Sequence, residues 1–237
     1  MGIAELNTTD NALTIHSHII TYGNAATEQL TEQIREEIEN MWNEPKAMVT
    51  FIKSSFFKRT ETKYLLQFRI TAQYLPNLTS IQVVENTDPR NNYFRIEDFV
   101  HGNISFVDGL GSNSGYFKTE NLLPGWTTAA HEYGHILGLD HPQQLDIRGR
   151  GIPGIMYPRG TLVDPQYQYD PSKPAGVTGG TMHPMHRKVK QGDVDNLKLH
   201  QLRFVNNRAV VGNFTNVYHP NHAEISVDYF NPPPISG

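Results

Sequence analysis

The chain has 237 residues, enough for one substantial domain with a buried core. Its formal net charge of −4 gives no electrostatic reason to expect a nucleic acid as partner. It contains no cysteine, which excludes disulfides and thiol nucleophiles, and no run of apolar residues approaches the length of a membrane span.

The chain begins Met-Gly-Ile-Ala-Glu, without the basic and then apolar layout of a signal peptide. Two locations fit this start. The protein either stays in the cytoplasm or is a mature or excised piece that is secreted or delivered, and the second is our expectation. Residues 1–11 are expected to form an N-terminal extension.

The first half of the chain alternates between extended segments and one long amphipathic helix. Residues 13–22 alternate loosely between two faces, which predicts a strand. Between residues 25 and 43 the period becomes helical, with apolar side chains at i, i+4, i+8 and i+11, and Pro45 follows the end of this pattern. Further strands are predicted at residues 47–53, 64–74, 81–84 and 93–96.

A short segment at residues 103–108 precedes a glycine-rich loop at residues 109–115. Asp108 and Asn113 in this region offer oxygen ligands of the kind that Ca²⁺ prefers. Their spacing matches no EF-hand, so an ordinary loop without calcium is the alternative.

The densest chemical pattern is His-Glu-Tyr-Gly-His-Ile-Leu-Gly-Leu-Asp-His at residues 131–141. On a helix, His131 and His135 lie one turn apart on the same face, which is the spacing that a zinc ion requires. Gly138 can end the helix and reverse the chain, so that His141 returns as a third ligand. Glu132 lies beside the first ligand without being one. Three protein ligands leave a position open for water, which is typical of a catalytic zinc site.

Two helices are predicted in the second half of the chain. The first carries the histidine pattern; Thr127 or Thr128 can cap its start, and it runs to about Leu137. The second follows Gln191, with Asp193 as its cap. Its inward-facing side chains are expected to be Val194, Leu197 and Leu202.

The histidine pattern resembles that of the metzincin clan of zinc endopeptidases. The clan also has a methionine turn below the zinc, and the sequence Gly-Ile-Met-Tyr-Pro around Met156 is similar to it. Met-Tyr-Pro is similar to the matrixin version of this turn, whereas Pro142 after the third histidine is similar to the serralysin version. Astacins and serralysins have a tyrosine where this chain has Pro158, so Tyr157 receives no catalytic role.

The resemblance implies an α+β fold of the zincin kind, a twisted mixed sheet with an antiparallel edge strand, a backing helix, the zinc-site helix and a C-terminal helix. It implies a catalytic domain at residues 12–205, with an upper part to about residue 138 and a lower part from about residue 139. Residues 206–237 remain an extension of unknown structure.

The resemblance also assigns segments to substrate binding. The expected edge strand, which pairs with an extended protein or peptide substrate, contains Asn103, Ile104, Ser105 and Phe106. The segment after Met156 is expected to form the wall of the pocket for the residue after the cleaved bond. In that segment His183 and His186 would hold a second metal, contact substrate or be ordinary loop histidines.

These observations predict a zinc-dependent endopeptidase. One Zn²⁺ on the three histidines would activate a water molecule, and Glu132 would act as general base when that water attacks a peptide carbonyl. Two alternatives stay open. One is a catalytically silent binding module stabilised by zinc; the other is the same protease acting as a delivered bacterial toxin, because residues 22–137 loosely resemble metallopeptidase modules of Rhs-type toxins. The oligomeric state is left open.

Overall fold

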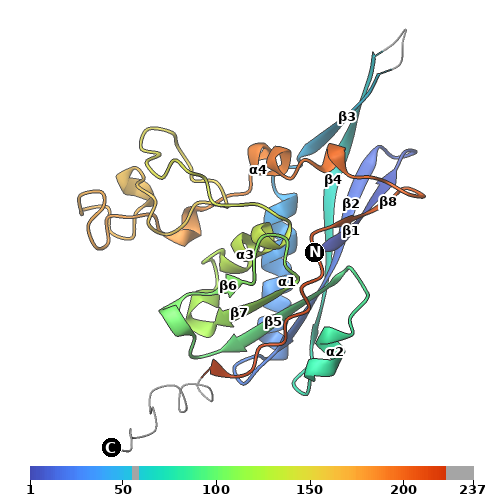
Figure 1. Ribbon diagram of the computed structural model, residues 1–237. Coiled ribbons are helices and arrows are strands. Elements are labelled where there is room, and N and C mark those ends of the chain that lie inside the picture. The colour runs from blue at the N-terminus through green and yellow to red at the C-terminus, as the bar shows by residue number, and fades with distance from the viewer. Residues whose placement is uncertain (55–58, 223–237) are drawn as a thin grey trace, which may run out of the picture.

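The long strand β2 (Ala12–Tyr22) is the axis of a curled, mixed sheet in the computed structural model, which describes residues 1–54 and 59–222 (Figure 1). On one side, β2 pairs in parallel with β4 (Arg59–Tyr74). On the other side, its first half pairs antiparallel with β1 (Gly2–Asn7), and its second half pairs in parallel with β5 (Asn91–Glu97). The sheet therefore divides into two branches along β2.

Each end of the sheet is closed by an antiparallel partner. Next to β1 lies β8 (Arg208–Val211), and next to β4 lies β3 (Met48–Ser54). The branch through β5 continues to β7 (Ser114–Lys118) in parallel and ends at the two-residue strand β6 (Phe106–Val107), which is antiparallel to β7. The edge of this branch is therefore an antiparallel strand, the feature that the resemblance to metzincins implies.

Four α-helices accompany the sheet in the described residues. The long helix α1 (Glu28–Asn43) packs against β4 and against α3 (Thr128–Ile136), whereas α2 (Ser80–Val84) and α4 (Gln191–Asn196) are short. In this part of the chain no helix combines the length and apolar character that crossing a bilayer requires. Short 3₁₀ segments lie at His101–Asn103, Thr119–Leu122, Pro165–Tyr167, Pro184–His186 and Leu199–Gln201.

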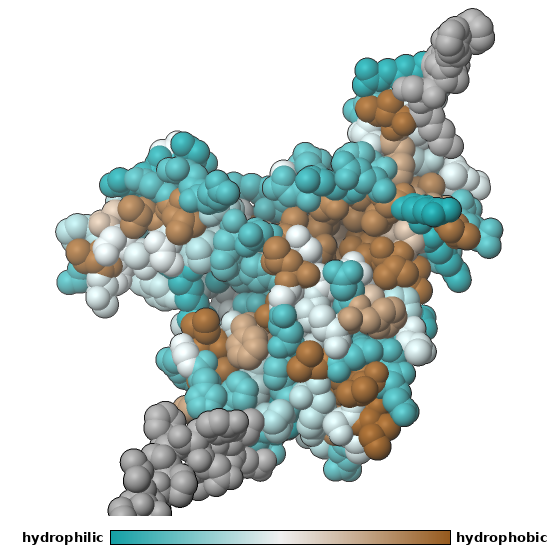
Figure 2. Space-filling model, viewed as in Figure 1, coloured by the Kyte–Doolittle hydropathy of each residue, from teal (hydrophilic) through white to brown (hydrophobic). Residues whose placement is uncertain are grey.

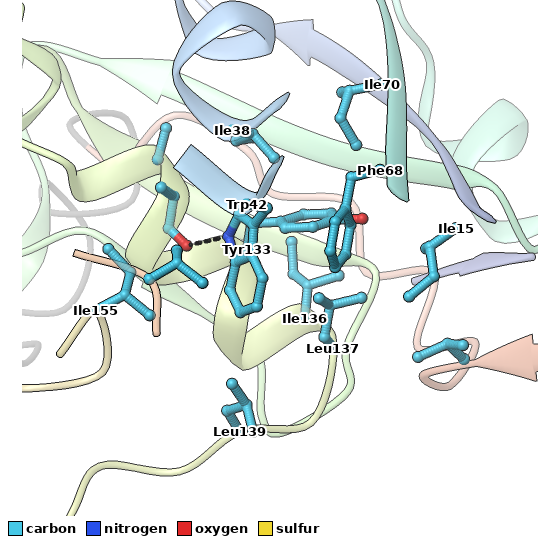
Figure 3. Packing of buried hydrophobic residues seen from close by; sticks show 14 of the residues in the cluster. Ile15, Ile38, Trp42, Phe68, Ile70, Tyr133, Ile136, Leu137, Leu139 and Ile155 are labelled. Carbon is cyan, nitrogen blue, oxygen red and sulfur yellow. Dashed lines mark hydrogen bonds between the residues drawn. The ribbon is translucent and has the colours of Figure 1, made fainter. Parts of the chain in front are cut away.

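Three aromatic side chains join α1, α3 and the sheet in the main core (Figure 3). The Trp42 ring centroid lies 5.3 Å from that of Phe68 and 5.9 Å from that of Tyr133. The indole Nε1 of Trp42 donates a hydrogen bond to the backbone oxygen of Ala130 at 3.0 Å, so packing and a directional contact both hold α3 in place.

The segment between α3 and α4 has little regular structure and projects from the sheet as the yellow and orange loops of Figure 1. It has a small core of its own, made of Ile147, Val163 and Met182 with Tyr157 and Tyr167 packed against it. An isolated bridge between Gln168 and Met182 adds backbone pairing.

Most predicted elements of the first half are confirmed, but the strand predicted at residues 81–84 is wrong. These residues form α2, because Thr79 and Gln82 make a capping box at its start. The backbone N–H of Thr79 donates to Oε1 of Gln82 at 2.9 Å. Ile81 and Val84 are 64% and 62% exposed, and within this run only Val83 is buried, as expected for one face of a short helix.

The two terminal segments contribute strands to the sheet. Residues 1–11, expected as an extension, contain β1, and the side chain of Ala4 is fully buried there. In the other expected extension, at residues 206–237, β8 pairs with β1. The last part of that segment, residues 223–237, lies outside the described residues.

The edge strand and the last helix are both shorter than expected. Asn103 lies in a 3₁₀ segment with a φ of 58°, and only Phe106 and Val107 of the expected strand pair with β7. The strand β7 was not predicted, because it begins within the glycine-rich segment. In α4 the cap position belongs to Lys190, and Asp193 accepts the backbone N–H of Lys190 at 2.8 Å from inside the first turn.

Candidate metal centre and the cavity beside it

Three histidine side chains converge where α3 ends. His131 and His135 project from α3, and His141 approaches from the loop that follows. The Nε2 atom of His141 lies 3.1 Å from Nε2 of His131 and 3.1 Å from Nε2 of His135. The structure therefore brings together the three residues that the sequence predicts as metal ligands.

Gly138 makes this convergence possible by reversing the chain. Its φ is +99°, a conformation that a Cβ would disfavour, and the preceding residue, Leu137, is the C-cap of α3. The N–H of Gly138 donates to the oxygen of His135 at 2.9 Å, and the N–H of Leu139 donates to the oxygen of Gly134 at 3.0 Å. This pair of bonds is a Schellman motif, and it lies at the glycine where the sequence analysis placed the end of the helix.

Backbone carbonyls fix the orientation of two of the imidazoles. Nδ1 of His131 donates to the oxygen of Ile155 at 2.7 Å, and Nδ1 of His135 donates to the oxygen of Leu139 at 2.7 Å. A carbonyl can only accept, so Nδ1 carries the hydrogen in both rings. Burial lowers the pKa of each ring, which keeps the rings neutral near pH 7 and leaves their Nε2 lone pairs free.

Two of the three ligand separations are close to those around a tetrahedral divalent cation, and the ligand atoms of all three histidines lie within 4.8 Å of one another. With metal–nitrogen bonds of about 2.0–2.1 Å, the nitrogens of a tetrahedral zinc site lie about 3.3 Å apart. The two Nε2–Nε2 distances of 3.1 Å to His141 are close to this value. Lone pairs that face one another at such distances repel, and a cation between them removes the repulsion. Three imidazoles do not select zinc among the first-row metals.

The methionine turn lies under α3 and supports it by close contact. Met156 is buried, and a Cβ added to Gly134 would lie 2.3 Å from its sulfur. The preceding residue, Ile155, supplies the carbonyl that orients His131. The support expected of Met156 therefore depends on the absence of a side chain at Gly134. This glycine lies within the histidine motif, but the sequence did not mark it as important.

The start of α3 is capped in a way that the sequence did not indicate. Thr127 occupies the N-cap position, as expected, but its side chain makes no cap hydrogen bond: its φ is 59°, and its hydroxyl donates to the oxygen of Pro184 at 2.7 Å. Oε1 of Glu37, on α1, instead accepts the N–H of Ala130 at 3.0 Å, and the carboxylate also accepts from Ala129. A partly buried carboxylate from another helix thus accepts hydrogen bonds from the first turn of α3.

A cavity of about 190 Å³ opens beside the histidines, in the recess between the loop segment and the body of the sheet (Figure 2). Glu132, which is 7% exposed, lines it together with two of the histidines. Burial raises the pKa of Glu132 to about 8, against the opposing effect of Arg187 and Arg159. The cavity is lined by Ile104, Ser105, Asn121, Thr128, His131, Glu132, His141, Pro158, Arg159 and Arg187.

Only part of the expected substrate strand reaches this cavity. Ile104 and Ser105 line it, and the Ser105 hydroxyl accepts the N–H of Lys118 at 3.1 Å. Phe106 lies in β6, and the side chain of Asn103 accepts a hydrogen bond from the ammonium of Lys118. The residues that touch the cavity therefore precede the paired part of the strand.

The two candidate calcium ligands are occupied by other groups. Asp108 accepts from Nε2 of His219 at 2.9 Å. The side-chain oxygen of Asn113 accepts the N–H groups of Thr215 and Asn216, at 3.0 and 2.9 Å, as well as the Thr215 hydroxyl. These contacts attach residues 213–219 to the sheet, and they leave Asn113 no lone pair for calcium.

The arginines of the cavity were missed by the sequence analysis. Arg159 follows the methionine turn and Arg187 follows His186, and no spacing rule connects either one with the histidine motif. His183 and His186, which the sequence analysis considered, do not line the cavity; Nδ1 of His183 accepts the N–H of Met185 at 3.2 Å. Asp140 accepts the backbone N–H of His141 at 2.7 Å and so steadies the third ligand.

No protein-family model matches this chain, and its comparison with curated proteins finds no match. The similarity to metzincins therefore consists of the residues of the histidine pattern and the methionine turn. The geometry adds that these residues meet in one place, as a zincin-like site requires.

Replacing Glu37 by alanine should destabilise the protein by about 1–3 kcal/mol, because two buried N–H groups at the start of α3 lose their acceptor. Denaturant unfolding of the metal-free protein measures this. Glu36→Ala is the matched control on the same helix, since Glu36 is 60% exposed and its ion pair with Arg35 is long at 3.5 Å. Equal stability of the two variants would contradict the assigned cap.

Gly134→Ala should cost about 1–3 kcal/mol of stability and weaken metal binding, because the new methyl group collides with the Met156 sulfur. Gly192→Ala is the control, since a Cβ there meets no atom within 4 Å. Adding Met156→Ala to Gly134→Ala should recover part of the loss. If the stability changes of the two single variants add up to that of the double variant, the contact between position 134 and Met156 is unimportant.

Proposed function

We propose that this protein is a zinc-dependent endopeptidase of the metzincin kind, acting on protein or peptide substrates. The observation that carries the proposal is the shared cavity: His131, His141 and the buried carboxylate of Glu132 line the same recess. A metal centre and a general base that face one cavity can act on the same bond.

The side chains of the site divide into metal ligands and a general base. His131, His135 and His141 would hold the ion, and zinc bound there would polarise the scissile carbonyl and lower the pKa of a water molecule. The positive charge of a cation on the three histidines would lower the raised pKa of Glu132. A carboxylate oxygen of Glu132 could then take the proton from the attacking water and pass it to the leaving nitrogen. Glu132 itself is only 7% exposed, and burial of this kind strengthens electrostatic interactions.

Two features favour catalysis over a purely structural zinc site. Among the described residues, the metal-binding group contains the three histidines and no fourth side chain, so a coordination position remains for water. Glu132 is also hard to explain in a silent module. A carboxylate buried without an ion pair in the described chain is costly, and a stabilising zinc does not need it.

The sheet edge supports an extended mode of substrate binding. β6 ends its branch of the sheet, and the residues just before it, Ile104 and Ser105, line the cavity. A peptide chain laid along this edge would form backbone hydrogen bonds and place one of its side chains in the cavity. The proposed substrate is therefore an extended segment of a protein or peptide.

The metal requirement can be measured without any substrate. Metal-depleted protein should bind one Zn²⁺, and zinc at 100 times its Kd should stabilise the folded state by about 2.7 kcal/mol. His141→Ala should weaken binding sharply, whereas His200→Ala, an exposed histidine outside the group, should not. Calorimetric titration and thermal unfolding report both effects. Unchanged zinc affinity in folded His141→Ala would remove this residue from the site.

Glu132→Gln should retain zinc and lose about 10²- to 10⁴-fold in kcat, the usual contribution of a general base. The assay is hydrolysis of a broad fluorogenic peptide library with and without a chelator, with metal content measured on the same samples. Glu36→Gln on α1 serves as the control. Near wild-type turnover in Glu132→Gln would refute its role as base, and bound zinc without any cleavage would favour the silent module.

A further inference from the structure

Two arginines in the cavity have no carboxylate partner within ion-pair distance in the described chain. The Arg187 side chain is 3% exposed, and its Nε and Nη1 atoms are buried without a hydrogen-bond partner among the described residues. Both atoms belong to a charged group, whose burial without partners is strongly unfavourable. A group from outside the chain would satisfy them.

The charges around Arg187 favour an anion as that group. Arg159 adds a second positive charge, while Glu132 and Glu37 act on Arg187 without forming an ion pair. Tyr169 is the other titratable side chain that influences it. Burial lowers the pKa of Arg187 to about 10, so the guanidinium still carries its charge near neutral pH.

The second arginine is held in place from two sides. Nη2 of Arg159 donates to Oδ1 of Asn121 at 2.8 Å, and its guanidinium lies 5.0 Å from the ring centroid of Trp126. The hydroxyl of Thr128, which also lines the cavity, is buried and has no partner in the described chain. Several preorganised donors therefore lack a bond inside the same recess.

The size of the cavity limits what it can hold. Pockets for drug-sized ligands have volumes of roughly 300–1,000 Å³, and this cavity, at about 190 Å³, is smaller. It suits one short side chain or one chain end. Carboxylates match the fork of donors on a guanidinium, and Asp, Glu and a C-terminus all present one.

We infer that Arg187, assisted by Arg159, binds a carboxylate of the substrate next to the scissile bond. This inference rests on the proposed endopeptidase for its position beside the reacting atoms. It makes the enzyme selective for an acidic residue, or a chain end, at the position that enters the cavity. In this role the arginines set specificity, and Glu132 remains the base.

The first test compares cleavage of matched peptides that carry Asp or the isosteric Asn at each position around the cleaved bond. Wild-type protein should favour Asp at one position by about 10- to 100-fold in kcat/KM, the range expected for a charge-assisted hydrogen bond. Arg187→Gln should abolish the preference and Arg159→Gln should reduce it. Arg148→Gln, at an exposed arginine paired with Asp146, is the control.

The same peptides with free and amidated C-termini separate the two sources of the carboxylate. A preference that requires the free terminus identifies a chain end, and one that survives amidation identifies an acidic side chain. Equal cleavage of Asp and Asn peptides, with no effect of the terminus, would overturn the carboxylate site while leaving the endopeptidase intact. Arg159 is only half-buried, so Arg159→Gln keeps the test valid if Arg187→Gln fails to fold.

A binding measurement separates this inference from the proposed function. Trp126 lies under Arg159, and the second tryptophan, Trp42, is buried in the core, so tryptophan fluorescence reports on the cavity. The probes are acetyl-Gly-Asp-Gly-amide, its Asn counterpart and acetyl-Gly-Asp with a free C-terminus. Arg187-dependent binding of an Asp peptide without any cleavage would sustain the carboxylate site and reject the endopeptidase. Equal binding of the Asp and Asn peptides would reject the site.

Discussion

The candidate metal centre depends on two hydrogen bonds that its histidines make through Nδ1, the ring nitrogen that faces away from the metal position. Nδ1 of His131 and His135 donates to the carbonyls of Ile155 and Leu139, and this turns both Nε2 atoms toward His141. Each carbonyl belongs to a turn: Leu139 to the reversal after α3, and Ile155 to the methionine turn. Fixing the rings therefore also fixes the two chain segments that form one side of the cavity.

The helix that carries these ligands could not be stable alone. α3 has nine residues, all of them buried, and isolated helices of that length are marginal in water. Its position comes from tertiary contacts: the Trp42 indole at its backbone, the Ser17 hydroxyl at 2.7 Å from the hydroxyl of Tyr133, and the Glu37 carboxylate at its start. The metal site is consequently as rigid as the core between α1 and the sheet.

The sequence was informative where structure follows from local spacing. The extended period located β2 and the helical period located α1. The intervals between the histidines, with a turn at Gly138, predicted which three rings converge. Contacts between distant segments could not be read in this way. Glu37 looks like any acidic residue on an amphipathic helix, and nothing local marks Arg187 as a cavity residue. At residues 81–84, a pattern of apolar side chains was outweighed by the Thr79–Gln82 cap.

The cavity holds a buried carboxylate and a buried guanidinium without joining them. In the described chain no ion pair within 4 Å connects Glu132 with Arg187, although both line the recess. A direct salt bridge would occupy the carboxylate lone pairs needed to accept a proton, and it would occupy the donors needed to bind an anion. Because they are separated, both groups remain available to a ligand. This availability does not stabilise the folded core, but a binding site for a charged substrate needs it. The unsatisfied polarity of the cavity is therefore better explained by a missing binding partner than by the stability of the fold.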